Sequence, residues 1–346
     1  MNRLLLAFGL LLFLCGCSRQ EIPARFDLEL FQLSEEISIR ALHVVSENEL
    51  WLSGNLGRYA HTTNGGETWK LDSLRDFTHS ELRGIWANEK GNVYLMRCAA
   101  PAAVLHSADY GQHWTKGQVD ADSSSFYDAL AFWNEKAGIV FGDPKDGCFD
   151  LYITENGGMN WTKIDCKNLP SAMDGEAAFA SSNSNVHLFG SLIRIATGGK
   201  ATRLLLSEDS GNSWQAFAIP LSSGAQMTGT FSMDFYDEMR GIAVGGNYEK
   251  PEITDSCVAI TTDGGRTWKL SADSPGQLSC VRYIPGYRGE FLMACSRAGV
   301  FVSRNGGFHW ERISEEAFHT LRPSADGKVV WFAGPAGRVG VIRLRD

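Results

Sequence analysis

The sequence predicts an all-β protein in which seven similar units form the blades of a single β-propeller. Three observations support this fold. One short pattern, S/T-x-D/N-x-G-x-(T/S/N/H)-W, occurs six times along the chain. Its copies are spaced by 42 to 54 residues, which is the length of a propeller blade. The residues between the copies form short runs of alternating apolar and polar side chains, without the periodicity of helices.

Each copy of the pattern predicts a tight turn between the two outer strands of a blade. In the copy at 261–268, Asp263 can accept hydrogen bonds from backbone N–H groups, and Gly265 can adopt a positive φ. Trp268 begins the return strand and has a large ring to bury between neighbouring blades. Half of the turns carry Asn in place of Asp, so we assign these residues a structural role. The residues that define the turns are Asn64, Trp69, Asp109, Trp114, Asn156, Trp161, Asp209, Trp214, Asp263, Trp268, Asn305 and Trp310.

A seventh unit lacks the turn but contains three predicted strands, at 319–322, 329–333 and 339–344. The alternating segment 26–33 precedes the first unit and has no partner of its own. We therefore expect this N-terminal strand to become the outermost strand of the seventh blade. This pairing closes the ring and covers a sheet edge that would otherwise be exposed.

The first residues are typical of a bacterial secretion signal. Arg3 precedes an apolar run at 4–14, which is too short to span a bilayer. The run ends in Leu14-Cys15-Gly16-Cys17, which resembles the lipobox of bacterial lipoproteins. That resemblance implies a signal peptide at 1–16, a tether at 17–25 lipidated on Cys17, and a propeller at 26–346. The protein would then be extracytoplasmic and membrane-anchored, with the outer membrane favoured by Ser18. A plain secretory signal or a retained anchor is the alternative.

The turn pattern resembles the Asp-box, also called the bacterial neuraminidase repeat. The unit that includes 240–246 and 258–268 is similar to propellers of the photosystem II stability/assembly factor family and to related exported bacterial proteins. The resemblance covers nearly the whole mature chain and implies the propeller fold. It does not determine the activity, because Asp-box repeats occur in sialidases, xyloglucanases, sorting receptors and assembly factors alike.

Composition and missing motifs exclude several classes of function. The net charge of −8 and the lack of a Lys/Arg run argue against nucleic acid as a partner. The sequence contains no G-x-S-x-G elbow before a helix, no H-E-x-x-H, no dinucleotide fingerprint and no C-x-x-C-H haem motif. We therefore expect no cofactor and no metal centre.

Sialidase chemistry is the sharpest enzymatic alternative. It requires an arginine triad for a substrate carboxylate, a tyrosine nucleophile with a glutamate, and an aspartate as acid/base. Four arginines lie on or beside predicted innermost strands, but we expect them to form ion pairs at the blade ends: Arg40, Arg83, Arg282 and Arg322. The Arg-Ile-Pro segment that sialidases carry in their first blade is absent.

Two pairs of cysteines are candidates for disulfides in an oxidising compartment. Cys148 and Cys166 flank the third motif turn, and Cys280 and Cys295 flank a turn between adjacent strands. Buried free thiols are the alternative for both pairs.

Candidate binding residues lie in the third to fifth units, which are the longest, and insertions in repeat folds usually map to a functional face. These residues are Asp128, Asp143, Asp146, Glu176, Arg203, Tyr248 and Lys250. Their mixed charge suits a peptide, a protein loop or a glycan, and ordinary solvated loops are the alternative.

We expect a membrane-anchored binding or assembly module that uses its central face, with a protein or glycan ligand. A sialidase-like glycoside hydrolase or a carbohydrate-binding protein is one alternative. The hydrolase would need two carboxylates about 5–9.5 Å apart, for which Asp143 and Glu176 are the candidates. A purely structural surface protein is another alternative, and it predicts no convergent polar cluster.

Overall fold

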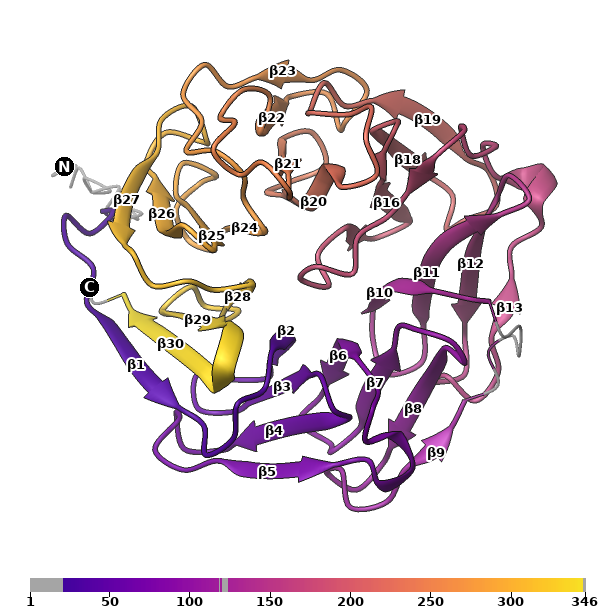
Figure 1. Cartoon of the computed structure of the whole chain (residues 1–346), viewed down its shortest axis with the longest axis vertical. Coiled ribbons are helices and arrows are strands. Elements are labelled where there is room, and N and C mark those ends of the chain that lie inside the picture. Colours follow the sequence, from indigo (N-terminus) through magenta and orange to yellow (C-terminus); the bar gives the residue numbers. More distant parts are fainter. Residues whose placement is uncertain (1–20, 118, 120–123, 345–346) are drawn as a thin grey trace, which may run out of the picture.

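Seven antiparallel sheets surround a central axis in the computed structural model, as Figure 1 shows. The structure describes residues 21–117, 119 and 124–344. The seven-bladed all-β fold expected from the repeats is confirmed. The predicted signal peptide and Cys17 lie outside the described residues. Within the described part of the chain, no helix is both long and apolar enough to cross a membrane.

The first four blades follow the chain from the axis outwards, innermost strand first. Blade 1 contains β2 (Ile39–Val44), β3 (Leu50–Gly54), β4 (Arg58–Thr62) and β5 (Lys70–Ser73). Blade 2 contains β6 (Leu82–Ala87), β7 (Val93–Arg97), β8 (Ala103–Ser107) and β9 (Thr115–Lys116). Blade 3 contains β10 (Tyr127–Phe132), β11 (Gly138–Lys145), β12 (Cys148–Thr154) and β13 (Thr162–Lys163). Blade 4 contains β15 (Val186–Phe189), β16 (Leu192–Ala196), β18 (Arg203–Ser207) and β19 (Gln215–Ala218).

The remaining blades have the same order, with one extension. Blade 5 contains β20 (Thr228–Phe235), β21 (Gly241–Asn247), β22 (Val258–Thr261) and β23 (Lys269–Leu270), and β17 (Gly198–Gly199) and β14 (Glu176–Ala177) extend its inner edge. Blade 6 contains β24 (Cys280–Tyr283), β25 (Leu292–Ser296), β26 (Gly299–Ser303) and β27 (Glu311–Ser314). Blade 7 contains β28 (Thr320–Pro323), β29 (Val329–Ala333), β30 (Arg338–Arg343) and β1 (Leu28–Gln32). Three short 3-10 helices lie between described strands: η1 (Arg75–Phe77), η2 (Cys166–Asn168) and η3 (Pro335–Gly337).

The ring closes through the N-terminal strand, as the sequence predicts. β1 pairs antiparallel with β30, and the register runs from Leu28 opposite Ile342 to Gln32 opposite Arg338. The first strand of the chain thus covers the edge of the last one, and both lie side by side in Figure 1.

Apolar side chains form seven buried clusters, and each cluster fills the interface between two neighbouring blades. Six of these clusters receive one tryptophan from a motif turn, always from the later of the two blades. Trp268, for example, packs against the cluster of blades 4 and 5, and Trp310 is a buried member of the cluster of blades 5 and 6. These rings therefore lie between neighbouring blades.

The cluster between blades 6 and 7 receives no motif tryptophan, because blade 7 lacks the turn. Ile22 and Phe26 pack against this cluster instead, and Phe26 stacks on Phe291 with 5.7 Å between ring centroids. Arg304 Nη2 donates to Pro23 O at 3.1 Å, so part of the segment predicted as a tether is held against blade 6.

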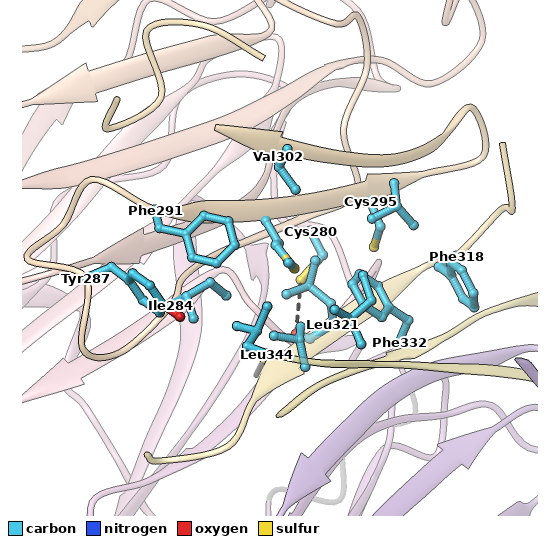
Figure 2. Packing of buried hydrophobic residues seen from close by; sticks show 14 residues of the cluster. Cys280, Ile284, Tyr287, Phe291, Cys295, Val302, Phe318, Leu321, Phe332 and Leu344 are labelled. Atoms are coloured by element: carbon cyan, nitrogen blue, oxygen red, sulfur yellow. Dashed lines mark hydrogen bonds between the residues drawn. The ribbon is translucent and has the colours of Figure 1, made fainter. Parts of the chain in front are cut away.

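The two cysteine pairs differ. Cys148 and Cys166 form a disulfide. Cys280 and Cys295 are opposite each other on β24 and β25 but remain free thiols. Figure 2 shows both within the cluster of blades 6 and 7, where Cys280 Sγ contacts Leu321 O of blade 7 at 3.6 Å. The Cys280 side chain is directed at blade 7, and the candidate pairing is therefore not formed.

Candidate binding site at the channel mouth

Four innermost strands carry a one-residue β-bulge close to their first residue. The pairing with the second strand skips Arg40 in β2, Arg83 in β6, Asp128 in β10 and Phe231 in β20. A bulge re-aims the side chain of the extra residue. Because all innermost strands begin at the same end of the ring, these four side chains belong to one end of the central channel. We call this end the channel mouth, and include in it Tyr248, Arg297 and His319, which contact the bulged residues or one another.

The segment 180–185, which we call the plug, precedes β15 and projects towards the centre of the ring in Figure 1. Ser182, Ser184 and Asn185 have no exposed surface. Hydrogen bonds join the plug to five other blades: Arg83 Nη1 to Ala180 O (3.3 Å), Leu130 N to Asn183 Oδ1 (2.9 Å), Met233 N to Ser184 O (2.9 Å), Ser182 Oγ to Ser279 O (2.8 Å) and Arg322 Nη2 to Asn183 O (2.6 Å). The plug is therefore held across the channel by contacts with five blades.

Three arginines and Tyr248 form a cluster at the mouth. The Arg40 guanidinium lies near the Tyr248 side chain, although the two residues belong to blades 1 and 5, and this proximity partly offsets the lowering of the pKa of Arg40. The Arg297 guanidinium lies over the Tyr248 ring, 4.5 Å from its centroid, in a cation–π contact. Arg83 lies close enough to Arg40 for its positive charge to affect the pKa of Arg40. The cluster thus joins residues from four loops or strands that are distant in sequence.

The charges of this cluster are not balanced. Glu81 is the one carboxylate bonded to it, through Arg83 Nε at 3.1 Å. Among the described residues, no carboxylate lies within 4 Å of Arg40. Burial lowers the pKa of Arg40, and the charge of Arg83 lowers it further. His319 stays neutral, because burial and the same two arginines lower its pKa to about 3. The mouth therefore presents partly desolvated cationic groups, which suit a carboxylate.

A pair of carboxyl groups borders the cationic cluster. Asp128 is fully buried, and neither oxygen of its carboxyl group accepts a hydrogen bond from the described residues. The Asp143 carboxyl lies close to it, and Asp143 Oδ1 accepts from Ala178 N at 2.9 Å. Burial, followed by the neighbouring Asp143 charge, raises the pKa of Asp128 well above its usual range, and burial also raises the pKa of Asp143. We infer that the pair shares a proton, which limits its negative charge.

The other residues singled out from the sequence lie at the same end of the ring but have different roles. Glu176 accepts two hydrogen bonds from Arg203, at 2.9 Å from Nε and 2.5 Å from Nη2, and this buried ion pair fastens β14 to β18. Asp146 is exposed at the turn between β11 and β12, and Lys250 is exposed in the loop after β21. The structure thus joins Asp128 with Asp143 and Glu176 with Arg203, but it does not bring all seven residues into one pocket.

The arginines also differ from the expectation of ion pairs at the blade ends. Arg83 and Arg282 do form such pairs, with Glu81 at 3.1 Å and Asp234 at 3.7 Å. Arg322 donates to backbone oxygens of the plug instead, and Arg40 faces Tyr248. Within the described residues neither has a carboxylate within 4 Å.

Sequence reasoning missed Arg297, Phe231, His319 and the plug. It also missed that Arg40, Arg83 and Asp128 are structurally equivalent. One signal could have found this equivalence, because "IRAL", "LRGI" and "YDAL" place these residues at the second position of an innermost strand.

The fold and this end of the channel define a class of protein, a closed seven-bladed β-propeller with a plugged channel and a cationic mouth.

No family model matches the sequence, and no curated protein is significantly similar to it. Solved structures do match. YCF48 bound to D1 peptide has a TM-score of 0.63 at 16% identity, over 92% of this chain and 97% of that one. YCF48 from Cyanidioschyzon merolae has a TM-score of 0.65 at 15% identity, over 91% of this chain and 98% of the other.

A glycoside hydrolase is also similar in fold. The GH74 xyloglucanase from Xanthomonas campestris has a TM-score of 0.64 at 14% identity, over 92% of this chain but only 54% of the enzyme. At these identities, the comparisons show a shared propeller fold and leave the function to be argued from this chain's own residues.

Proposed function

We propose that this chain is an Asp-box β-propeller that binds an acidic segment of a protein partner at its channel mouth. One observation carries the proposal: Arg40 and Arg297 lie beside Tyr248, Arg83 lies beside Arg40, and among the described residues Glu81 is the one carboxylate bonded to these arginines. Arginine clusters are a recurrent means of recognising acidic peptide segments, because a guanidinium can donate two parallel hydrogen bonds to a carboxylate.

The shape of the mouth favours a surface-bound segment. The plug prevents a chain from threading the channel, so a ligand rests on the mouth and contacts the residues around it. Exposed apolar side chains on loops at this end, Met173, Tyr248 and Ile253, supply contact area beside the arginines. The YCF48 structure with a D1 peptide is consistent with this proposal, because it provides a peptide ligand for a propeller of similar fold.

The proposal includes export and lipid anchoring through Cys17. It is supported by the apolar run at 4–14 and the lipobox-like residues that follow it. Ile22 packs on the cluster between blades 6 and 7, so the five residue-to-residue steps from Cys17 to Ile22 would span at most about 18 Å. The anchored propeller would therefore keep the edge formed by blades 6 and 7 close to the bilayer, and its mouth would be free for a partner. Radiolabelled palmitate incorporation, lost on Cys17→Ala, tests the anchor.

Isothermal titration calorimetry with the mature chain tests binding at the mouth. The probe is a ten-residue peptide that contains four Glu, and its matched control has Gln at those positions. We expect the Glu peptide to bind and Arg40→Ala to weaken it at least tenfold, because a hydrogen bond to a charged group contributes about 1.5–3 kcal/mol. Arg266→Ala on the rim is the control, since this arginine pairs with Glu208 away from the mouth. Equal affinity for both peptides, or equal losses in both variants, would contradict the proposal.

A glycoside hydrolase is the alternative function, because a xyloglucanase has a similar fold. The residues of the mouth favour binding over catalysis. Both oxygens of Glu176 are occupied by Arg203, Thr197 and a backbone N–H, and Asp128 is in direct contact with Asp143 rather than about 5–9.5 Å away. Tyr248 has arginines as its neighbours, and no carboxylate of the described residues is bonded to it. Measurable release of a fluorogenic aglycone from a sialoside or a xyloglucan oligosaccharide, abolished by Tyr248→Phe or Asp143→Asn, would overturn this assignment.

A further inference from the structure

A second recess lies on the outer side of the ring, between blades 1 and 2. We call it the rim pocket. Its volume is about 520 Å³, and its walls include Tyr59, Asp72, Phe77 and Trp114. The short helix η1 follows the outermost strand of blade 1 and contributes Arg75 and Phe77 to the wall. The rim pocket is separate from the channel mouth, because it is formed by outer strands and a motif turn.

The base of the rim pocket is rigid and polar. The Tyr59 hydroxyl donates to Gly111 O at 3.0 Å and accepts from Trp114 Nε1 at 3.1 Å. Tyr59 is 95% buried, since 5% of its surface is exposed, and burial raises its pKa to about 12. The Asp72 carboxyl lies close enough to this hydroxyl for its negative charge to raise the pKa of Tyr59 as well. Interlocked groups of this kind need little reorganisation when a ligand arrives.

The entrance of the rim pocket carries two cations. Arg75 and Lys116 are exposed, and no carboxylate of the described residues lies within 4 Å of either. Gln112 also lines the pocket, and its side-chain Nε2 donates to Asp109 O at 3.0 Å, which leaves the amide oxygen as an acceptor. The lining thus combines half-buried aromatic rings, hydrogen-bond acceptors and a net positive charge.

We propose that the rim pocket binds an acidic sugar, such as a hexuronate residue of a polysaccharide. The apolar face of a sugar ring can pack on Phe77 or Trp114, and its hydroxyl groups can donate to Asp72 and Gln112. Its carboxylate pairs with Lys116 or Arg75. The Asp72 carboxylate disfavours a phosphate dianion at the same place, because like charges repel.

A second rim pocket provides a matched internal control. It lies between blades 2 and 3, has the same volume of about 520 Å³, and also contains a tyrosine whose hydroxyl bonds a motif turn, Tyr94 to Gly157 O at 2.9 Å. Its charged lining residues are Glu135, Glu155 and Lys136, so its net charge is negative. Two pockets of equal size and related construction therefore differ in the sign of their charge, and only the first suits an acidic ligand.

Calorimetric titration of the mature chain with trigalacturonate tests the proposal. We expect a dissociation constant in the millimolar range or tighter, and at least tenfold weaker binding of a neutral glucose trisaccharide. Lys116→Ala and Arg75→Ala should each weaken trigalacturonate binding at least fivefold, whereas Lys136→Ala in the control pocket should leave it unchanged. Circular dichroism and unfolding curves of all variants confirm that they are folded.

Three outcomes would overturn the proposal: no binding of trigalacturonate, binding that is insensitive to Lys116→Ala and Arg75→Ala, or tighter binding of glucose 6-phosphate than of galacturonate. The last result would mark the pocket as a phosphate site. Because Arg40 is not part of the rim pocket, the result is independent of the peptide titration at the mouth.

Discussion

The rim and the axis of this propeller are built in different ways. On the rim, each motif turn satisfies its own polar groups within a few residues: the Ser/Thr hydroxyl donates to the Asp/Asn Oδ1 at 2.7–3.1 Å in all six turns. The same Oδ1 accepts from the backbone N–H that precedes the tryptophan at 2.8–3.0 Å.

Along the axis, by contrast, polar groups find partners in distant blades. Arg322 and the plug residue Asn183 are 139 positions apart in the chain. The rim therefore repeats one local arrangement of hydrogen bonds, whereas the contacts along the axis are specific to this chain. The determinants of partner binding at the mouth are therefore expected along the axis, where contacts between blades set the position of each side chain.

The largest expected effect concerns a tryptophan of the rim that packs between two blades. Trp310 originates in a motif turn and is 7% exposed between blades 5 and 6. We expect Trp310→Ala to lower the free energy of unfolding by about 3–5 kcal/mol, because truncating a buried tryptophan leaves a cavity. Urea unfolding measures the change. Leu270→Ala, at an exposed position of the rim, is the control, and an equal loss in both variants would remove the assigned sealing role.

The axis is tested by Arg322→Met. This change removes the guanidinium that donates to Ser182 O and Asn183 O, while it preserves part of the apolar stem. We expect a loss of about 2–3 kcal/mol in the free energy of unfolding, because buried plug carbonyls lose charged donors. Hydrogen exchange should also show faster exchange of plug amides than of motif-turn amides. Unchanged protection of the plug would mean that Arg322 does not hold it.

Rim and axis carboxyl groups should respond to pH in opposite directions. Partial burial alone would raise the pKa of Asp263, but hydrogen bonds from the side chain and backbone of Thr267 lower it to about 2. Its stabilising contribution is present above the ordinary aspartate pKa of about 3.9 and is lost as pH falls towards 2. Solvent screening limits this contribution to about 1 kcal/mol.

Asp128 has a raised pKa, so its contribution has the opposite sign. It is fully present below pH of about 3.9 and is lost as pH rises towards the raised pKa. Asp128→Asn should therefore stabilise the protein more at pH 7 than at pH 4, relative to the parent. Urea unfolding at pH 3, 4, 5 and 7 distinguishes the two groups. A parallel pH profile for Asp128→Asn and its parent would contradict the shared-proton assignment.

The smallest effect is expected for exchanges between the two motif residues. Asp263→Asn should change stability at pH 7 by less than about 0.5 kcal/mol, because Asn64, Asn156 and Asn305 already make the same hydrogen bonds through Oδ1. Thermal unfolding of this variant beside Asp263→Ala gives the contrast. A large loss for Asn would imply that the negative charge itself matters on the rim.

The sequence predicts the rim almost completely, since a motif turn is encoded by residues that are neighbours in the chain. It also predicts how the ring closes, because the unpaired strand at 26–33 and the incomplete last unit complement each other. The disulfide between Cys148 and Cys166 was one of two candidate pairs. The second pair, Cys280 and Cys295, remains reduced because the Cys280 side chain is directed at blade 7. The spacing of cysteines in the sequence does not predict that direction.

The mouth could be predicted only in part. The loops of blades 3 to 5 do reach this end of the channel, and Asp128, Asp143 and Tyr248 lie there. The cationic cluster depends on Tyr248 reaching Arg40 from another blade, which is a tertiary contact without a local signal. Their charge makes Glu176 and Arg203 candidate binding residues in the sequence, but in the structure they neutralise each other in a buried pair. Charge type alone does not separate a binding residue from a structural one.

The central claim is that partners bind at the channel mouth, and site-specific photo-crosslinking in cells tests it most directly. A benzophenone amino acid is placed at Ile253, an exposed position on the same loop as Tyr248, or at Phe308, an exposed position on the rim. We predict a discrete protein adduct from position 253 that disappears when Arg40→Ala is added, and no such adduct from position 308. The same adduct from both positions, or an adduct that persists without Arg40, would contradict the claim.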